Sequence, residues 1–151
     1  MLFHFTHFAI VDAAGRPPDA ALWAARRERL LALAKATNMT IVAKGPDTMI
    51  AAPDGRLACA PPASSWLSTA GTGDVLAGMI AGFMSQGLAP AEAAVCAQHV
   101  GNAVAASWTA NRAGGAMQPT DMTEALPQVL RERFGASDGS EPCALIPLLY
   151  G

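Results

Sequence analysis

The sequence contains few cysteines, and their arrangement excludes two kinds of protein. Only three occur among 151 residues, Cys59, Cys96 and Cys143, and no two of them form a C-x-x-C pair. An odd number of widely spaced cysteines argues against a disulfide framework and against a structural zinc site. Such cysteine usage fits a reducing compartment, so we expect a cytoplasmic protein.

Charged residues are also scarce, and no part of the chain is strongly basic. They make up 15% of the sequence, the formal net charge is −2, and there is no run of Lys or Arg. Nucleic acid and anionic membrane surfaces are bound through positive patches or stripes. We therefore expect neither partner.

Long apolar runs are missing as well. No stretch approaches the roughly 20 apolar residues that a membrane-spanning helix needs. The opening segment MLFHFTHFAIV is apolar, but it lacks the basic start and the small-residue cleavage site that signal peptides carry. We therefore do not interpret it as a signal peptide.

Two common nucleotide-binding patterns are absent. No G-x-x-x-x-G-K-[ST] sequence occurs, which excludes a P-loop of the Walker type. No predicted strand leads directly into G-x-G-x-x-G with an acidic residue about 20 positions later, which excludes the Rossmann dinucleotide fingerprint. A nucleotide site in this chain would have to use another motif.

What is present predicts an α/β protein. Periodicity, capping and turn residues place the elements in the following order: a strand within Leu2–Val11, a helix capped by Asp19 and ending near Thr37, a buried strand in residues 39–44, a hairpin of residues 48–52 and 57–60 around Asp54-Gly55, a loop in 61–73, and helices near 74–86, 91–108 and 121–134. The arginine-rich segment RRER, residues 26–29, is expected mostly on the solvent face of the first helix.

The chain is expected to form one domain, residues 1–134, followed by a tail, residues 135–151, that is poorly ordered or loosely docked. Pro127 should kink the last helix or divide it in two. We interpret Met79, Met84 and Trp108 as core residues, and His99 as a packed, hydrogen-bonded histidine rather than a catalytic one.

The segment STAGTGDVLAG, Ser68–Gly78, is the most informative part of the sequence. Gly71 and Gly73 lie just before an apolar helix, so backbone N–H groups can point outward without side chains in the way. The helix dipole adds partial positive charge at that end. Together these features predict an anion site suited to a phosphate group.

Asp74 is the only charged residue in that segment. A carboxylate beside a phosphate site repels the anion, unless it takes a proton from a hydroxyl group that attacks phosphorus. The segment therefore favours phosphoryl transfer. An alternative remains open, because a glycine-rich loop can be no more than a tight turn and Asp is an ordinary helix-capping residue.

A second segment, VAKGPDTMIAAPDGR at Val42–Arg56, gives this motif a context. Together with STAGTGDVLAGMIAGFMSQGL, at Ser68–Leu88, it resembles the ADP- or ATP-dependent NAD(P)H-hydrate dehydratases, metabolite-repair lyases of the ribokinase-like fold. The resemblance extends over roughly Ala20–Phe134. It implies a partial three-layer α/β fold that contains the C-terminal part of the ribokinase-like sheet with its flanking helices.

The resemblance also implies site residues. Asp74 would contact the hydrated nicotinamide and act as the base that activates the ring hydroxyl for phosphorylation. Loss of phosphate would then restore NADH or NADPH. ADP or ATP would be the phosphoryl donor, with Mg²⁺ offsetting its charge, and no side chain is assigned as a metal ligand. The residues implied to bind the nucleotide are Lys44, Gly45, Pro46, Asp47, Thr48, Gly71, Thr72 and Gly73.

The sequence departs from the family in lacking the front half of the catalytic domain. A sheet cut in this way would expose an unpaired edge and an apolar face. We expect the first strand, a second copy of the chain or a separately made N-terminal half to cover them, unless the chain is an unstable fragment. Two other functions remain open: a ribokinase-like kinase of a sugar or vitamin alcohol, and a nucleotide-binding remnant without activity of its own.

Overall fold

The computed structural model describes residues 3–6, 20–45, 47–60, 64–111 and 116–134. They fall into two compact units, divided between Pro62 and Ala63, and each unit is described by itself. The predicted tail, residues 135–151, lies outside the described residues, so the division into a domain and a tail stays a prediction. Within the described part of the chain, no helix combines the length and the apolar character needed to cross a membrane.

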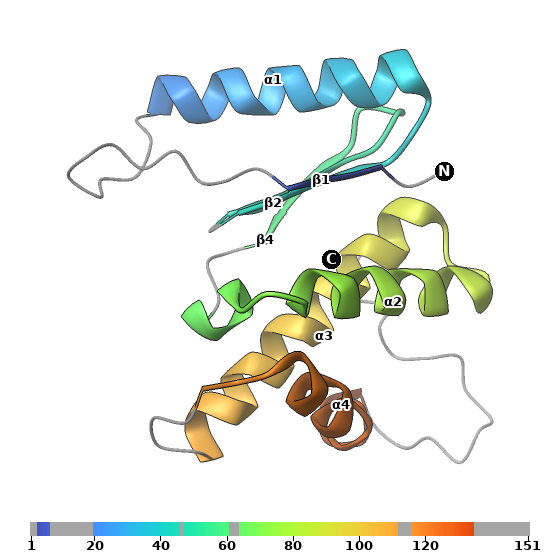
Figure 1. The fold of residues 1–151 in the computed structure, drawn as a ribbon. Coiled ribbons are helices and arrows are strands. Elements are labelled where there is room, and N and C mark those ends of the chain that lie inside the picture. The colour runs from blue at the N-terminus through green and yellow to red at the C-terminus, as the bar shows by residue number, and fades with distance from the viewer. Residues whose placement is uncertain (1–2, 7–19, 46, 61–63, 112–115, 135–151) are drawn as a thin grey trace. The chain divides into compact units, whose positions relative to one another are not determined.

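The first unit contains a four-stranded sheet in the order β1-β2-β3-β4 (Figure 1). Strand β1 (Phe3–Thr6) runs parallel to β2, and the other two pairs are antiparallel. The first strand was expected within Leu2–Val11, and the part of that segment beyond Thr6 lies outside the described residues. The remaining strands are β2 (Ile41–Lys44), β3 (Thr48–Ala51) and β4 (Leu57–Ala60).

Helix α1 (Ala20–Thr37) covers one face of this sheet (Figure 1). Ala34, Ile41 and Ala51 are buried together, and leucines on α1 pack around them. Asn38 takes a left-handed conformation with φ of 52°, and the chain turns there into β2. The predicted helix and buried strand are therefore both confirmed.

The predicted hairpin is also confirmed. Gly55 has φ of 94°, which glycine adopts without steric cost. The Ala52 N–H donates to the Arg56 carbonyl at 2.9 Å. Both Oδ atoms of Asp54 accept hydrogen bonds from Arg56, from the backbone N–H at 3.0 Å and from Nε at 2.8 Å. These bonds lower the pKa of the Asp54 carboxyl below its ordinary value.

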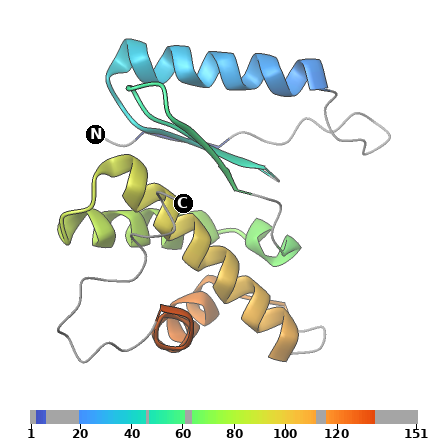
Figure 2. The same ribbon diagram turned by 180° about the vertical axis from the view of Figure 1, so that it is seen from behind.

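The second unit contains a short 3₁₀ helix, η1 (Ser65–Ser68), and three α-helices. Helix α3 (Pro90–Asn111) packs against both α2 (Thr72–Ser85) and α4 (Pro119–Phe134) (Figure 2). Small residues make this packing close: a Cβ atom built on Gly101 would lie 3.4 Å from Cε of Met79. Met79 is buried, which confirms its assignment to the core.

Several details differ from the expectations. Met84 was expected in the core, but it lies on the exposed side of α2 with an exposure of 36%. His99 was expected to be packed, but it faces outward on α3. Pro127 lies inside α4 without dividing it into two elements. Gly87, with φ of 99°, follows α2 as predicted for a helix stop.

Candidate functional site

The segment Lys44–Thr48 connects the end of β2 to the start of β3. Ile41 packs against α1, so the alternation of side chains along a strand turns Ala43 to α1 and Lys44 to the opposite face. Lys44 is half-buried. A lysine offers a compact positive charge to a phosphate, and that role of Lys44 stays a prediction.

Inside this segment, Thr48 is 6% exposed and its Oγ1 donates to the Gly45 carbonyl at 3.4 Å. The hydroxyl therefore stabilises the turn as it stands. Asp47 is half-buried, and Pro46 lies outside the described residues. Among the described residues, Lys44 ends β2 and Thr48 begins β3, and the contact of this segment with a nucleotide stays a prediction.

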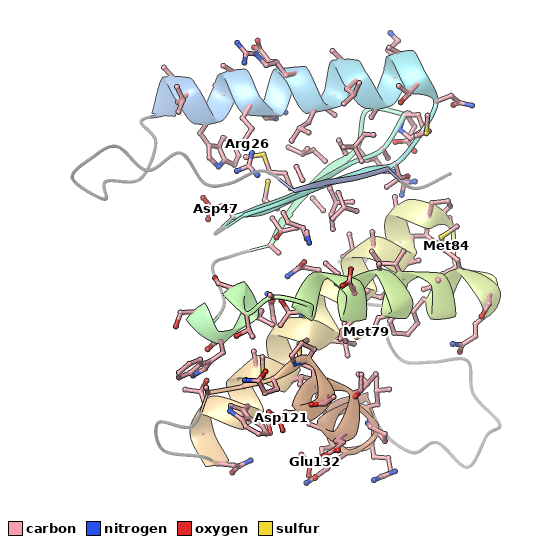
Figure 3. All side chains as sticks on the ribbon, in the orientation of Figure 1. Arg26, Asp47, Met79, Met84, Asp121 and Glu132 are labelled. Carbon is pink, nitrogen blue, oxygen red and sulfur yellow. The ribbon has the colours of Figure 1, made fainter. Side chains whose placement is uncertain are left out.

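Arg26 on α1 reaches the same turn, although sequence analysis expected most of RRER to face solvent. Its Nη2 donates to the Ala43 carbonyl at 3.2 Å. Figure 3 shows the Arg26 side chain directed from α1 toward the end of the sheet where Asp47 lies. Half-burial of a charged group on the sheet side of a helix was not visible in the sequence, because arginine is common on solvent faces.

The charge around this end of the sheet is mixed. Partial burial of its thiol raises the pKa of Cys59, and the nearby negative charge of Asp47 raises it further, while Arg26 and Arg27 lower it. Cys59 lies opposite Met49 in the β3–β4 pair. The pKa of Cys59 on β4 is therefore affected by a carboxylate and by two guanidinium groups.

The glycine loop forms the start of α2 in the second unit. Gly71 is the N-cap, with φ of 92°, and no side chain caps the helix. Oγ1 of the buried Thr72 lies 2.7 Å from the Leu67 carbonyl oxygen and 2.8 Å from that of Thr69, so its single proton is shared between these two acceptors. Its hydroxyl therefore fastens the loop to η1, which is a structural role that the sequence did not reveal.

Several backbone N–H groups of this turn already donate to backbone carbonyls. Those of Asp74 and Val75 donate to the Gly71 carbonyl, at 3.0 and 3.2 Å, and that of Thr72 donates to the Thr69 carbonyl at 3.2 Å. Among the described residues, the Gly73 N–H has no such backbone partner. It is a donor at this helix start that a bound anion could engage.

Asp74 lies in the first turn of α2 and is exposed. Helix α2 begins at Thr72 rather than at Asp74, so the N-cap is Gly71. The interpretation of Asp74 as an ordinary N-cap residue is therefore wrong, because the capping position is three residues earlier. Its carboxylate keeps a favourable position relative to the helix dipole and remains accessible.

A contact that the sequence did not indicate supports the loop. A Cβ atom built on Gly71 would lie 2.8 Å from Cγ of Pro119, the first residue of α4. Gly71 is thus required twice, by its left-handed backbone and by the proline ring beside it.

The predicted site residues fall into two groups. Residues 44, 45, 47 and 48 are together in the first unit, and Gly71, Thr72, Gly73 and Asp74 are together in the second. A site that joins the two groups stays a prediction. Within the described ranges, no three or more His, Cys, Asp or Glu side chains gather as they would around a protein-bound metal ion.

The sheet with its covering helix, the lysine-bearing turn and the bare helix start define a partial α/β protein of the ribokinase-like kind. The profile of the NAD(P)H-hydrate dehydratase family matches residues 18–128. The chain belongs to this family, as the resemblance of its two motifs implied.

Curated relatives of this chain are named as NAD(P)H-hydrate repair enzymes or NAD(P)H-hydrate dehydratases. The chain is 46% identical over 92 residues to the bifunctional NAD(P)H-hydrate repair enzyme Nnr of Salinibacter ruber, a match that covers 61% of this chain and 17% of the relative. It is 39% identical over 81 residues to the ADP-dependent (S)-NAD(P)H-hydrate dehydratase of Xanthomonas campestris, covering 54% of this chain and 28% of the relative. The chain thus spans less than a third of either protein.

Solved structures confirm the fold. The ADP/ATP-dependent NAD(P)H-hydrate dehydratase from Bacillus subtilis, co-crystallised with ATP and Mg²⁺, superposes with a TM-score of 0.67 at 32% identity. That superposition covers 74% of this chain and 40% of the other. The fold is therefore the partial ribokinase-like α/β fold expected from the sequence.

Proposed function

We propose that this chain carries the nucleotide-binding part and the catalytic carboxylate of an ADP- or ATP-dependent NAD(P)H-hydrate dehydratase. Membership in that family supports the proposal. The observation that carries it is Asp74, an exposed carboxylate in the first turn of a helix whose N-cap is a bare glycine. An acid in that position suits proton removal beside a phosphate.

In the proposed reaction, Lys44 and the Gly73 N–H bind the phosphates of the nucleotide. Lys44 supplies a compact positive charge, and the N–H group at the start of α2 supplies a fixed donor. Both stabilise the negative charge that spreads over the transferred group.

Asp74 then takes the proton from the ring hydroxyl of the hydrated nicotinamide. The hydroxyl oxygen forms a bond to the terminal phosphorus of the nucleotide as the bond from phosphorus to the bridging oxygen breaks, so ATP leaves as ADP, or ADP as AMP. The phosphate departs from the ring with the electron pair of the carbon–oxygen bond. Loss of a proton from the neighbouring ring carbon completes the double bond and gives NADH or NADPH.

Mg²⁺ fits this site as a companion of the nucleotide. It typically keeps several waters and takes one or two carboxylates plus phosphate oxygens, so it needs no cage of protein ligands. Asp74 is the carboxylate at the phosphate-binding helix start, and the ion would offset phosphate charge there.

The test is a turnover assay on the purified 151-residue chain with NADH-hydrate, Mg²⁺ and ADP or ATP. The return of nicotinamide absorbance is followed. Asp74→Asn should abolish turnover, by about 10²-fold or more as expected for loss of a general base, while nucleotide affinity stays within a factor of two or three. Glu92→Gln, a change of an acidic residue in the first turn of α3, is the matched control and should leave turnover unchanged.

Other outcomes would contradict the proposal. Accumulation of a phosphorylated alcohol would indicate a ribokinase-like kinase. Turnover that is the same in Asp74→Asn would remove Asp74 from the catalytic role. The absence of nucleotide binding would contradict the whole assignment.

A second candidate is a nucleotide-binding part that has no turnover by itself, favoured by the extent of the matches: 40% of the Bacillus subtilis structure is covered. In that case a second copy of the chain, or a complementing N-terminal half, would supply the rest of the substrate side. Nucleotide binding without turnover in the isolated chain, and turnover on mixing with an N-terminal half of a relative, would establish it.

A further inference from the structure

We propose that Arg26 is a positioning residue for the nucleotide, which holds the end of β2, at Ala43 and Lys44, in its binding conformation; the inference rests on the function proposed above. The guanidinium group donates to the Ala43 carbonyl, the last peptide group before Lys44. It therefore fixes the backbone from which the phosphate-binding ammonium group projects. Neither the motif nor its spacing indicates this arginine.

The contact is local and specific. Arg26 is half-buried on α1, 17 residues before Ala43, and its Nη2 lies 3.2 Å from the Ala43 oxygen. Ala43 is 4% exposed, so the bond lies at the buried end of β2. A hydrogen bond from a charged donor is among the stronger ones in proteins, and this one joins the helix to the strand end.

Gly45 fits the same arrangement. A Cβ atom built on Gly45 would lie 3.3 Å from Nη2 and 3.7 Å from Nη1 of Arg26. That spacing is tight, so a methyl group at position 45 would require the guanidinium group to move by a few tenths of an ångström. The glycine therefore leaves room for Arg26 at this strand end.

The electrostatic setting agrees with a positioning role. Asp47, in the same turn, and Arg26 act in opposite directions on Cys59, which places opposite charges near one strand end. Their side chains are labelled at this end of the sheet in Figure 3. A positive guanidinium group at the turn also favours the approach of a polyphosphate.

The experiment measures the affinity of the full chain for Mg-ATP and Mg-ADP by calorimetric titration. Arg26→Gln should weaken binding about tenfold, the loss expected for one charged hydrogen bond. Arg26→Lys should restore part of it, because an ammonium group can still donate one hydrogen bond to Ala43. Arg29→Gln, an exposed arginine of the same helix, is the matched control and should bind like the parent chain.

A double-mutant cycle separates positioning from general destabilisation. Gly45→Ala should weaken binding several-fold when Arg26 is present, because the new methyl group displaces the guanidinium. In the Arg26→Gln chain the same change should have little further effect, so the two losses are not additive. A purely structural role for Arg26 would give losses that follow the melting temperature and would show no rescue by lysine.

The outcomes distinguish this inference from the function beneath it. If Lys44→Ala weakens binding but Arg26→Gln does not, or if the losses in the cycle are additive, the role of Arg26 is overturned and the proposed function stands. If the parent chain binds neither nucleotide, both are overturned. If Arg26→Gln does not fold, Arg26→Lys and Gly45→Ala decide, and unchanged affinity in both overturns the inference.

Discussion

At the scale of single residues, surroundings rather than residue type decide behaviour. Asp54 and Asp74 are both exposed aspartates. Both carboxylate oxygens of Asp54 accept hydrogen bonds from Arg56 within the hairpin turn, whereas Asp74 lies in the first turn of a helix whose N-cap is a glycine. This difference makes Asp74 the better candidate for chemistry.

Cys59 provides a prediction at this scale. Partial burial and the charge of Asp47 raise the pKa of its thiol. Alkylation by iodoacetamide should therefore require a higher pH at Cys59 than in a short peptide of the same sequence, because only the thiolate reacts. The rate is measured against pH by mass spectrometry of the peptide that contains Cys59. A midpoint at or below that of the free peptide would contradict the assignment.

The neighbouring arginines give the control. Arg27 lowers the pKa of Cys59, so Arg27→Gln should move the alkylation midpoint to still higher pH.

The raised pKa of Cys59 also makes the free energy of unfolding depend on pH, because the folded chain holds this proton more tightly than the unfolded chain does. The contribution is therefore present below the pKa of the unfolded thiol and is lost as the pH rises through the pKa of the folded thiol.

At the scale of elements, turns and helix ends contain the positions where the fold requires a particular residue type. Gly55 in the hairpin and Gly71 before α2 both have a positive φ, of 94° and 92°. A Cβ atom at Gly55 would meet nothing within 4 Å, whereas one at Gly71 would meet Pro119. A side chain at position 55 would therefore cause backbone strain alone, whereas one at position 71 would cause backbone strain and also a steric clash with Pro119.

Alanine at each position tests this difference. Gly55→Ala should lower the free energy of unfolding by about 1–2 kcal/mol, the cost of a left-handed conformation for an L-residue. Gly71→Ala should cost a further 1–3 kcal/mol or so, because the proline ring must move. Urea denaturation measures both. Equal losses would contradict the Pro119 contact, and Pro119→Ala in the Gly71→Ala chain should reduce the extra loss.

At the scale of the whole molecule, nucleotide binding and folding are linked. A ligand that binds only the folded chain at 100 times its dissociation constant stabilises that chain by about 2.7 kcal/mol. Mg-ATP should therefore raise the melting temperature in a concentration-dependent way. Lys44→Ala at the same ATP concentration should show little increase. An equal increase in both chains would show that Lys44 does not bind the phosphates.

Much of the fold was predictable because its signals are local. The β-branched strand before Lys44, the Asp54-Gly55 turn and the glycine after α2 each act through residues next to them in sequence. Met84 was assigned wrongly for the opposite reason: an apolar residue on an apolar helix gives no sign of which side faces solvent. That choice depends on what packs against the helix.

The candidate site divides in the same way. The family was predictable, because the segments Val42–Arg56 and Ser68–Leu88 resemble it, and the family profile confirms that resemblance. The phosphate-binding role of the two motifs stays a prediction. The residues that support the two motifs were not predictable, because they come from other elements. Arg26 lies on α1, 17 residues before Ala43, and Pro119 lies at the start of α4.

The sequence by itself determined which segments become strands, turns and helices, and it is the source of the predicted phosphate-binding residues. Backbone conformation at Gly55, Gly71 and Gly87 follows from local sterics and needs no tertiary contact. Only the tertiary structure decided that Pro119 of α4 lies beside Gly71, and that one arginine of RRER turns inward to the end of β2. Such choices belong to packing, because they depend on which distant segment supplies the partner atom.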